Sequence, residues 1–340
     1  VVDIIEYCSE NMPLYNPVSV SGYHIREAGS TAAQELAFTL NNGFAYIEEC
    51  LERGLKIDNF AHRLSFFFNA HMDFFEEIAK YRAARRIWAN RLKNRYGAKN
   101  ESSLKLKFHT QTAGCSLTAQ QPENNIVRTA FEAMSAVLGG TNSLHTNSLD
   151  ETLALPSEKA AKIALRTQQI LAFETGVPNV ADPLGGSWYI EELTDKLEKQ
   201  AMKYFEEIKE MGGTVQAIED GYFQKKIAES ASIYQESIDS KDRIIVGVND
   251  FVEEDEELDI EILKISKDAQ NTQENKIKNL RKDRNDEILN KKMKKLSDAC
   301  KKDLNLVPFL IEVAEAGGTV GEIVEIMKKV YGEWEESFGI

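Results

Sequence analysis

Polar and apolar residues alternate in four short segments of the first 150 residues, as they do in β-strands with one polar face. The four segments are 18–24, 63–71, 104–111 and 141–147. Parallel strands that are covered by helices on both faces are normally apolar throughout. A polar face therefore indicates a sheet that lines a polar channel on one side. An antiparallel sheet with one solvated face is the alternative.

Within each segment the polar residues share one parity, so they are expected to lie on the same side of the sheet. The four polar sets are Ser19, Ser21 and Tyr23; Arg63, Ser65, Asn69 and His71; Lys105, Lys107, His109 and Gln111; and Thr141, Ser143, His145 and Asn147.

A segment with helical periodicity follows each strand-like segment. Thr31 and Gln34 have the spacing of a capping box. The helical pattern returns over 74–96, Pro122 suits the first position of a third helix, and Ser157 suits the cap of a fourth. Strand and helix in alternation require crossover connections, which favour a parallel sheet. Four such units form half of a (β/α)8 barrel, so the predicted fold class is α/β.

After residue 186 the alternation of strand-like and helical segments gives way to mostly helical segments. We expect residues 1–186 to form the second half of a TIM barrel and residues 187–340 to form a mostly helical linker or subdomain. Helices are predicted at 194–211, within 271–302, at 307–316 and at 319–331, and a short strand at 243–248. Because half a barrel would leave two sheet edges open, the chain is expected to belong to a longer polypeptide.

Composition narrows the functional classes. The chain has 41 basic and 55 acidic residues and a formal charge of −14, which argues against a nucleic-acid surface. No apolar run has the length of a membrane span, and no signal peptide is visible. The four cysteines lack metal-like spacing and a disulfide-rich context, so a cytoplasmic location is expected.

Short catalytic motifs for phosphate binding, zinc hydrolysis or serine hydrolysis are absent from the sequence. Barrel enzymes place their chemistry at the ends of strands. His24, His109 and His145 fall on or at the end of the strand-like segments, so they are candidates for function, with a structural role as the alternative.

Longer segments carry a more specific signal. They are Ser-Val-Ser-Gly-Tyr-His-Ile-Arg-Glu-Ala-Gly at 19–29, Arg-Leu-Ser-Phe-Phe at 63–67, His-Thr-Gln-Thr-Ala-Gly at 109–114 and Gly-Gly-Thr-Asn-Ser-Leu-His-Thr-Asn-Ser-Leu-Asp-Glu at 139–151. In this order they resemble the catalytic (large or alpha) subunit of the methylmalonyl-CoA mutase family of adenosylcobalamin-dependent acyl-CoA mutases. The resemblance covers nearly the whole chain and corresponds to the C-terminal part of the catalytic subunit.

The resemblance implies an isomerase that carries out a radical rearrangement of the carbon skeleton of an acyl-CoA, with adenosylcobalamin as cofactor. Conversion of (R)-methylmalonyl-CoA to succinyl-CoA is the main expectation. An isobutyryl-CoA or 2-hydroxyisobutyryl-CoA mutase large subunit is the alternative, because residues 25–29 read Ile-Arg-Glu-Ala-Gly where the animal-type pattern has Met-Gln-Glu-Ala-Gly. A noncatalytic scaffold subunit and a fragment without chemistry are further alternatives.

The resemblance also implies residue roles. His24 would donate to the thioester carbonyl, with Tyr23 beside it. Contacts with CoA are implied for Arg63, Ser65 and Ser143, and contacts with the adenosyl ribose and corrin for Gln111, Asn147 and Glu151.

The cobalamin motif Asp-x-His-x-x-Gly is absent, because no histidine in the chain follows an aspartate by two positions. No metal ligand is therefore expected in this chain. The resemblance implies that a cobalamin-binding small subunit or domain supplies the cobalt ligand, that the protein is a homo- or hetero-oligomer, and that the isolated chain is inactive.

Overall fold

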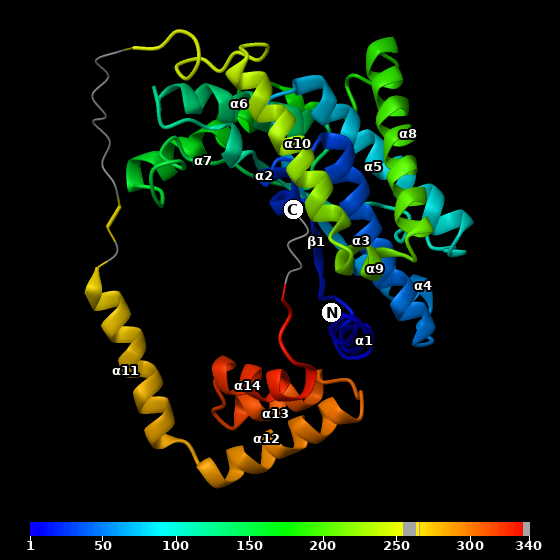
Figure 1. Cartoon of the computed structure of the whole chain (residues 1–340), viewed down its shortest axis with the longest axis vertical. Helices are drawn as coiled ribbons and strands as arrows, with labels where there is room; N and C mark the ends of the chain where they lie inside the picture. The colour runs from blue at the N-terminus through cyan, green and yellow to red at the C-terminus, as the bar shows by residue number, and fades with distance from the viewer. Residues whose placement is uncertain (254–262, 265, 336–340) are drawn as a thin grey trace. The chain divides into compact units, whose positions relative to one another are not determined.

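The computed structural model of the chain describes residues 1–253, 263–264 and 266–335 (Figure 1). These residues form two compact units. One unit begins at Asn16 and contains the sheet, and the other combines Val1–Tyr15 with the described residues from Lys264 onward.

The sheet has four parallel strands in the order β1-β2-β3-β4. The strands are β1 (Ser19–Ser21), β2 (Ser65–Ala70), β3 (Phe108–Thr112) and β4 (Ser143–His145). The predicted α/β class with parallel strands is confirmed, and the antiparallel alternative is wrong. This arrangement is that of part of a TIM-barrel-type domain.

The strands are shorter than predicted, for local reasons. The carboxylate of Asp58 accepts from the backbone amides of Lys99 and Asn100 and from the hydroxyl of Ser103, and these bonds hold a turn in front of β3. The strand prediction for 104–107 is therefore wrong. Arg63 is also outside its predicted strand, because it ends the short helix η1 (Ala61–Arg63).

Crossover helices follow the strands, as predicted. After β1 come α2 (Tyr23–Glu27) and α3 (Ala32–Glu52), after β2 comes α5 (Phe74–Asn94), after β3 comes α6 (Asn124–Leu138), and after β4 comes α7 (Glu158–Phe173). Shorter turns are α4 (Ile57–Phe60), η2 (Gly114–Ser116) and η3 (Val177–Asn179). The capping box of Thr31 with Gln34 and the cap by Ser157 are confirmed.

The prediction for Pro122 is wrong. Gln121 adopts a positive φ of 45°, and its carbonyl accepts from the amide of Asn124, so a turn precedes the helix. Helix α6 therefore begins at Asn124 instead of Pro122.

The sheet-containing unit continues past residue 186 through α8 (Trp188–Glu210), α9 (Thr214–Glu219) and α10 (Tyr222–Asp239). Helix α8 packs along α3 and α5, as Figure 1 shows. It begins earlier than the predicted residue 194. The strand prediction for 243–248 is wrong, because the side chain of Asn249 bonds the backbone of Ile245 and Arg243 and folds the segment into a loop.

Aromatic side chains form the core between the sheet and its helices. Phe66 and Phe68 point away from the polar face of β2 and are fully buried. Phe66 packs edge-on against Trp88 of α5, and Phe68 packs edge-on against Phe108 of β3. The buried side of the sheet therefore has the apolar character that the polar side lacks.

The other unit is helical, in agreement with the sequence. It contains α1 (Val2–Asn11), α11 (Lys267–Asp283), α12 (Asp286–Lys301), α13 (Val307–Glu315) and α14 (Val320–Tyr331). Leu289, Leu296 and Val313 form its core. The capping box of Thr319 with Glu322 is confirmed. Among the described residues of the whole chain, no helix is both long and apolar enough to cross a membrane.

Candidate functional site

The register of the four strands gathers polar side chains on one face of the sheet. Ser21, Phe67, His109 and Ser143 are Cα partners in neighbouring strands. Asn69, Gln111 and His145 form the next row. Ser143 and His145 are exposed, and His109 and Gln111 are half-buried, whereas the alternating residue Thr110 is fully buried. The polar face is confirmed for Ser21, His109, Gln111, Ser143 and His145, whereas Phe67 is an aromatic exception and Asn69 is fully buried.

Three of the predicted site residues meet at the carboxyl ends of the strands. The side-chain amide of Gln111 donates to the phenolic oxygen of Tyr23 at 2.8 Å and to Oδ1 of Asn147 at 2.9 Å. Asn147 is buried, and its own amide donates to the carbonyl of Thr112 at 3.0 Å. Tyr23, Gln111 and Asn147 therefore form one hydrogen-bonded group that joins α2, β3 and the segment after β4.

His24 lies beside this group at the start of α2. Strand β1 ends at Ser21, so the turn through Gly22 brings both Tyr23 and His24 toward the site. The His24 ring is exposed, and its Nδ1 lies 3.3 Å from Oγ of Ser21. Its other ring nitrogen is the one that a bound ligand can use.

Phe67 is a site residue that the sequence reasoning missed. Its ring stacks on Tyr23 with centroids 4.9 Å apart and contacts the ring of His109 edge-on at 4.9 Å. His109 in turn lies 2.8 Å from the hydroxyl of Ser143, measured from Nδ1. Phe67 lies two positions from both Ser65 and Asn69, and this spacing indicates that it shares their face of the strand.

Glu27 was also missed. Its carboxylate accepts from Nδ2 of Asn69 at 2.7 Å and from the backbone amides of Gly114 and Cys115, both at 2.8 Å. These bonds fasten α2 to the ends of β2 and β3. Its donors come from distant parts of the chain, so no local sequence pattern identified Glu27.

Acidic side chains lie close to one another at this end of the sheet. Burial, followed by the nearby charges of Glu27 and Asp150, raises the pKa of Glu151 above its ordinary value. Burial and the charge of Glu27 also raise the pKa of Tyr23, so its phenol stays protonated. Among the described residues there is no cluster of three or more histidine, cysteine, aspartate or glutamate side chains that could hold a metal ion.

Two further predicted residues lie at the opposite end of β2. Ser65 is half-buried, and its hydroxyl donates to the carbonyl of Val18 at 3.0 Å. Arg63 is half-buried and precedes the strand. Along an extended strand, Ser65 and Asn69 are about 13 Å apart. The structure thus brings Tyr23, Gln111 and Asn147 together and leaves Arg63 and Ser65 at a distance.

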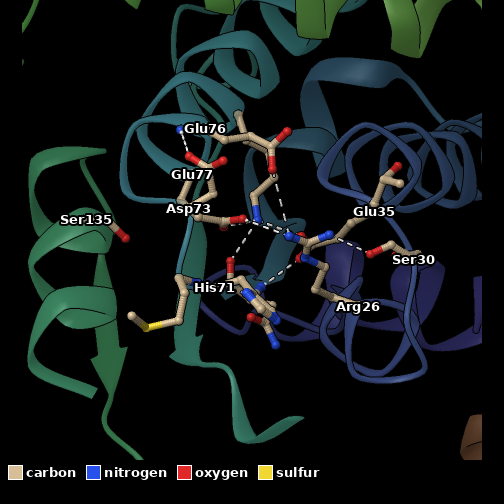
Figure 2. A network of polar contacts seen from close by, with 12 residues as sticks. Arg26, Ser30, Glu35, His71, Asp73, Glu76, Glu77 and Ser135 are labelled. Carbon is tan, nitrogen blue, oxygen red and sulfur yellow. Dashed lines mark hydrogen bonds and ion pairs between the residues drawn. The ribbon is translucent and has the colours of Figure 1, made fainter. Parts of the chain in front are cut away.

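A buried group of charged residues lies behind α2 (Figure 2). The ammonium group of Lys80 contacts Glu77, Oε2 of Glu35 at 2.5 Å and the carbonyl of Asn69 at 2.8 Å, and its side chain is fully buried. Burial raises the pKa of Glu35 to about 6. Burial would also raise the pKa of Glu77, but Lys80 and Arg26 outweigh it and hold that pKa below its ordinary value.

His71 lies at this buried group, as Figure 2 shows, and not on the polar face where its parity had placed it. Burial, assisted by the charge of Arg26, lowers the pKa of His71 to about 3, so the ring is neutral. Its Nδ1 accepts from the amide of Met72 at 2.8 Å.

Comparison with known proteins gives a consistent result. A family model described as methylmalonyl-CoA mutase matches residues 1–333. The chain is 46% identical over 340 residues to the 2-hydroxyisobutanoyl-CoA mutase large subunit of Aquincola tertiaricarbonis, covering 99% of this chain and 60% of that protein. It is 47% identical over 336 residues to methylmalonyl-CoA mutase of Rhizobium meliloti, covering 98% of this chain and 47% of that protein.

The mitochondrial methylmalonyl-CoA mutase of Homo sapiens is 46% identical over 335 residues, covering 98% of this chain and 44% of that protein. The chain therefore spans about half the length of the curated relatives it matches.

Proposed function

The chain belongs to the methylmalonyl-CoA mutase family, and we propose that it supplies part of the acyl-CoA site of an adenosylcobalamin-dependent mutase, an isomerase that rearranges the carbon skeleton of an acyl-CoA. The observation that carries the proposal is the polar face of the sheet, which has the Tyr23, Gln111 and Asn147 group at its carboxyl end and Arg63 and Ser65 at its other end. An elongated ligand with polar groups along its length suits such a face.

The CoA portion is assigned to the face between Arg63 and Ser143. A guanidinium group is suited to a phosphate, because it donates several hydrogen bonds and keeps its charge at all relevant pH values. The hydroxyls of Ser65 and Ser143 can exchange their present partners for amide groups of the pantetheine chain. The distance of about 13 Å between Ser65 and Asn69 leaves room for that chain.

The thioester is assigned to the end near Tyr23 and His24. An imidazole N–H directed at the thioester oxygen would stabilise charge that moves onto that oxygen during rearrangement. Tyr23 accepts from Gln111, and its own hydroxyl has Glu27 as a hydrogen-bond partner, so a ligand that accepts the phenolic proton would replace Glu27. The stacked ring of Phe67 limits the space beside Tyr23.

The residues around Gln111 suit the adenosyl part of the cofactor. Gln111 and Glu151 are half-buried and present amide and carboxylate groups that can bond ribose hydroxyls. Asn147 is buried and bonds Gln111, so we assign it the role of orienting Gln111. When bound, adenosylcobalamin supplies the radical chemistry, while these residues hold it in place. The cobalt ligand is assigned to a partner small subunit or domain.

Methylmalonyl-CoA is the proposed substrate. A 2-hydroxyisobutyryl-CoA or isobutyryl-CoA mutase is the second candidate, because the bacterial 2-hydroxyisobutanoyl-CoA mutase large subunit is as similar to this chain as the human methylmalonyl-CoA mutase, at 46% identity. The words "large subunit" in that relative's name favour a small-subunit partner and a hetero-oligomer. A cytoplasmic location belongs to the same proposal.

The test is an assay of the complete protein with its cobalamin-binding subunit or domain and adenosylcobalamin. Methylmalonyl-CoA, isobutyryl-CoA and 2-hydroxyisobutyryl-CoA are offered separately, and the products are separated by chromatography. Formation of the rearranged thioester from one of them supports the proposal and identifies the acyl group. CoA binding without conversion of any thioester would instead favour a noncatalytic scaffold subunit.

A further inference from the structure

Arg26 follows Tyr23 and His24 in the same helical turn but points away from the polar face of the sheet. We propose that Arg26 is a positioning residue, which sets the placement of Tyr23 and His24 by tying α2 to the buried charged group behind it. The catalytic consequence of this inference rests on the proposed function, whereas the structural consequence does not.

The contacts of Arg26 are directed at the protein interior. Figure 2 shows its guanidinium group between Ser30 on one side and Glu77 on the other. The Nη1 atom donates to the carbonyl of Ser30 at 2.5 Å, and the Nη2 atom lies 3.3 Å from Oε1 of Glu77. Arg26 is only 8% exposed, so these contacts are poorly accessible to water.

The partner of Arg26 is itself held firmly. Glu77 of α5 also contacts Lys80, which binds Glu35 of α3 and the carbonyl of Asn69 in β2. Arg26 is therefore linked to α3, α5 and β2 through a single buried group. The two cations Arg26 and Lys80 face the carboxylates of Glu35 and Glu77, and Glu76 lies 3.9 Å from Arg26, so removal of Arg26 would leave the buried Glu77 short of one partner, which is costly.

A helix of five residues cannot hold its own position, because so short a helix is not stable by itself. Adjacent residues attach α2 to two different places, since Arg26 bonds the buried group and Glu27 bonds the ends of β2 and β3. Rotation of α2 about its axis would break one of these two attachments. The side chains of Tyr23 and His24 are thereby fixed relative to the strand ends.

The test compares Arg26→Gln and Arg26→Lys with the unaltered protein. Arg86→Gln is the matched control, because Arg86 bonds Glu198 and Asp195 of α8 and belongs to the same unit without contacting α2. Backbone hydrogen exchange is measured by mass spectrometry in the complete protein without ligand. In Arg26→Gln, exchange over residues 23–30 should rise about tenfold or more, as expected for a lost charged hydrogen bond, and by clearly more than exchange in β2 and β3.

Turnover of the acyl-CoA substrate gives the second readout. A misplaced reacting group can lower turnover by about a hundredfold, so Arg26→Gln should lower kcat strongly while KM stays near its original value. Arg26→Lys keeps the charge and should recover part of both effects. Arg86→Gln should change neither quantity.

Unchanged exchange over 23–30 in Arg26→Gln would overturn the inference. So would an equal rise of exchange in β2 and β3, because it would indicate a general loss of stability. If the unaltered protein converts no acyl-CoA, the proposed function fails, and the exchange data still decide whether Arg26 positions α2.

Discussion

The side-chain amide of Gln111 donates to the phenolic oxygen of Tyr23 over 2.8 Å, which links the end of β3 to the first residue of α2. Burial and the charge of Glu27 raise the pKa of Tyr23, so the phenol keeps its proton although its oxygen accepts this bond. Glu27 is a hydrogen-bond partner of the same hydroxyl. Gln111 and Glu27 together therefore orient the Tyr23 hydroxyl.

His24 is the residue on which the proposed chemistry depends most. If its imidazole donates to the thioester oxygen, His24→Ala should lower turnover by about a hundredfold or more with CoA affinity nearly intact, as removal of a preorganised donor does. His24→Gln retains a donor and should be less damaging. Turnover, CoA affinity and thermal melting are measured together. A loss of melting temperature that accounts for the whole loss of activity would make His24 a structural residue.

Substitution of Arg63 tests whether the CoA portion binds at the end of β2 where Arg63 lies. We expect Arg63→Ala to raise KM more than it lowers kcat, by an amount that corresponds to about 1–3 kcal/mol for a lost charged hydrogen bond. Arg95→Ala is the control, because Arg95 is an exposed arginine of the same unit that pairs with Glu48. Steady-state kinetics measure both variants. Unchanged affinity for CoA in Arg63→Ala would contradict the assignment.

Gly22 connects β1 to α2 at a place where no side chain fits. Its φ of −100° suits any residue, but an added Cβ would lie 2.0 Å from Oγ1 of Thr39. Gly22→Ala should therefore destabilise the protein by about 1–3 kcal/mol through overpacking. The double variant Gly22→Ala with Thr39→Ala should recover part of that loss in denaturant unfolding.

Gly321 is the matched control for this substitution. It lies within α14, has ordinary helical geometry, and an added Cβ would meet no atom within 4 Å. Gly321→Ala should be neutral or stabilising by about 0.5–1 kcal/mol, because alanine favours the helix. Equal destabilisation by both glycine substitutions would exclude the steric explanation for Gly22.

Glu132 of α6 is a buried carboxyl group near the site. Burial raises its pKa well above the ordinary value, although a hydrogen bond with Ser116 opposes the shift. The Ser116 hydroxyl lies 2.9 Å from the carbonyl of Ala113 and 2.6 Å from Oε1 of Glu132. Ser116 has a single proton, so donation to Ala113 is compatible with a protonated Glu132 as donor to Ser116.

A raised pKa in the folded state makes stability depend on pH. Unfolded Glu132 loses its proton near pH 4.5, whereas the folded form keeps it, so the free energy of unfolding should fall as pH rises above about 4.5 toward the folded pKa. Glu132→Gln resembles the protonated carboxyl and should remove this slope. Denaturant unfolding at several pH values measures it, and parallel pH profiles for the two proteins would show that Glu132 is ionised in the folded state.

The parts of the fold that could be predicted are those that depend on short stretches of sequence. Two-residue alternation and helix caps act over a few residues, so the strands of the polar face and the caps at Thr31, Ser157 and Thr319 followed from the sequence. The start of α8 did not, because Trp188 and Tyr189 are 92% and 60% exposed and interrupt the amphipathic pattern. Apolar alternation at 243–248 has no partner strand in the described chain, and a loop forms instead.

The site was predictable only where the strand positions or the family resemblance identified single residues. Tyr23, Gln111 and Asn147 were named individually, but their mutual hydrogen bonds depend on strand register. The roles of Glu27 and Arg26 arise from contacts with residues far away in the chain, at Gly114 and Glu77 respectively. Tertiary pairing of this kind leaves no periodic signal in one sequence.

Arg284 and Glu322 form an ion pair in the helical unit. Arg284 donates to both carboxylate oxygens of Glu322, at 2.8 and 2.7 Å. These bonds, with the capping bonds from Thr319, lower the pKa of Glu322 to about 2. Unfolded Glu322 binds its proton near pH 4.5, so the stabilisation is fully present above that pH and is lost as pH falls toward 2.

Glu322→Gln should therefore destabilise the protein at neutral pH by about 1.5–3 kcal/mol, the range for hydrogen bonds to charged groups. The difference from the unaltered protein should shrink as pH falls from about 5 to 2. Glu333→Gln is the control, because Glu333 pairs with the partly exposed Lys328 and is itself 65% exposed, and such pairs contribute little. Denaturant unfolding at each pH gives the comparison, and a difference between Glu322→Gln and the unaltered protein that does not change with pH would contradict a charged Glu322 bound to Arg284.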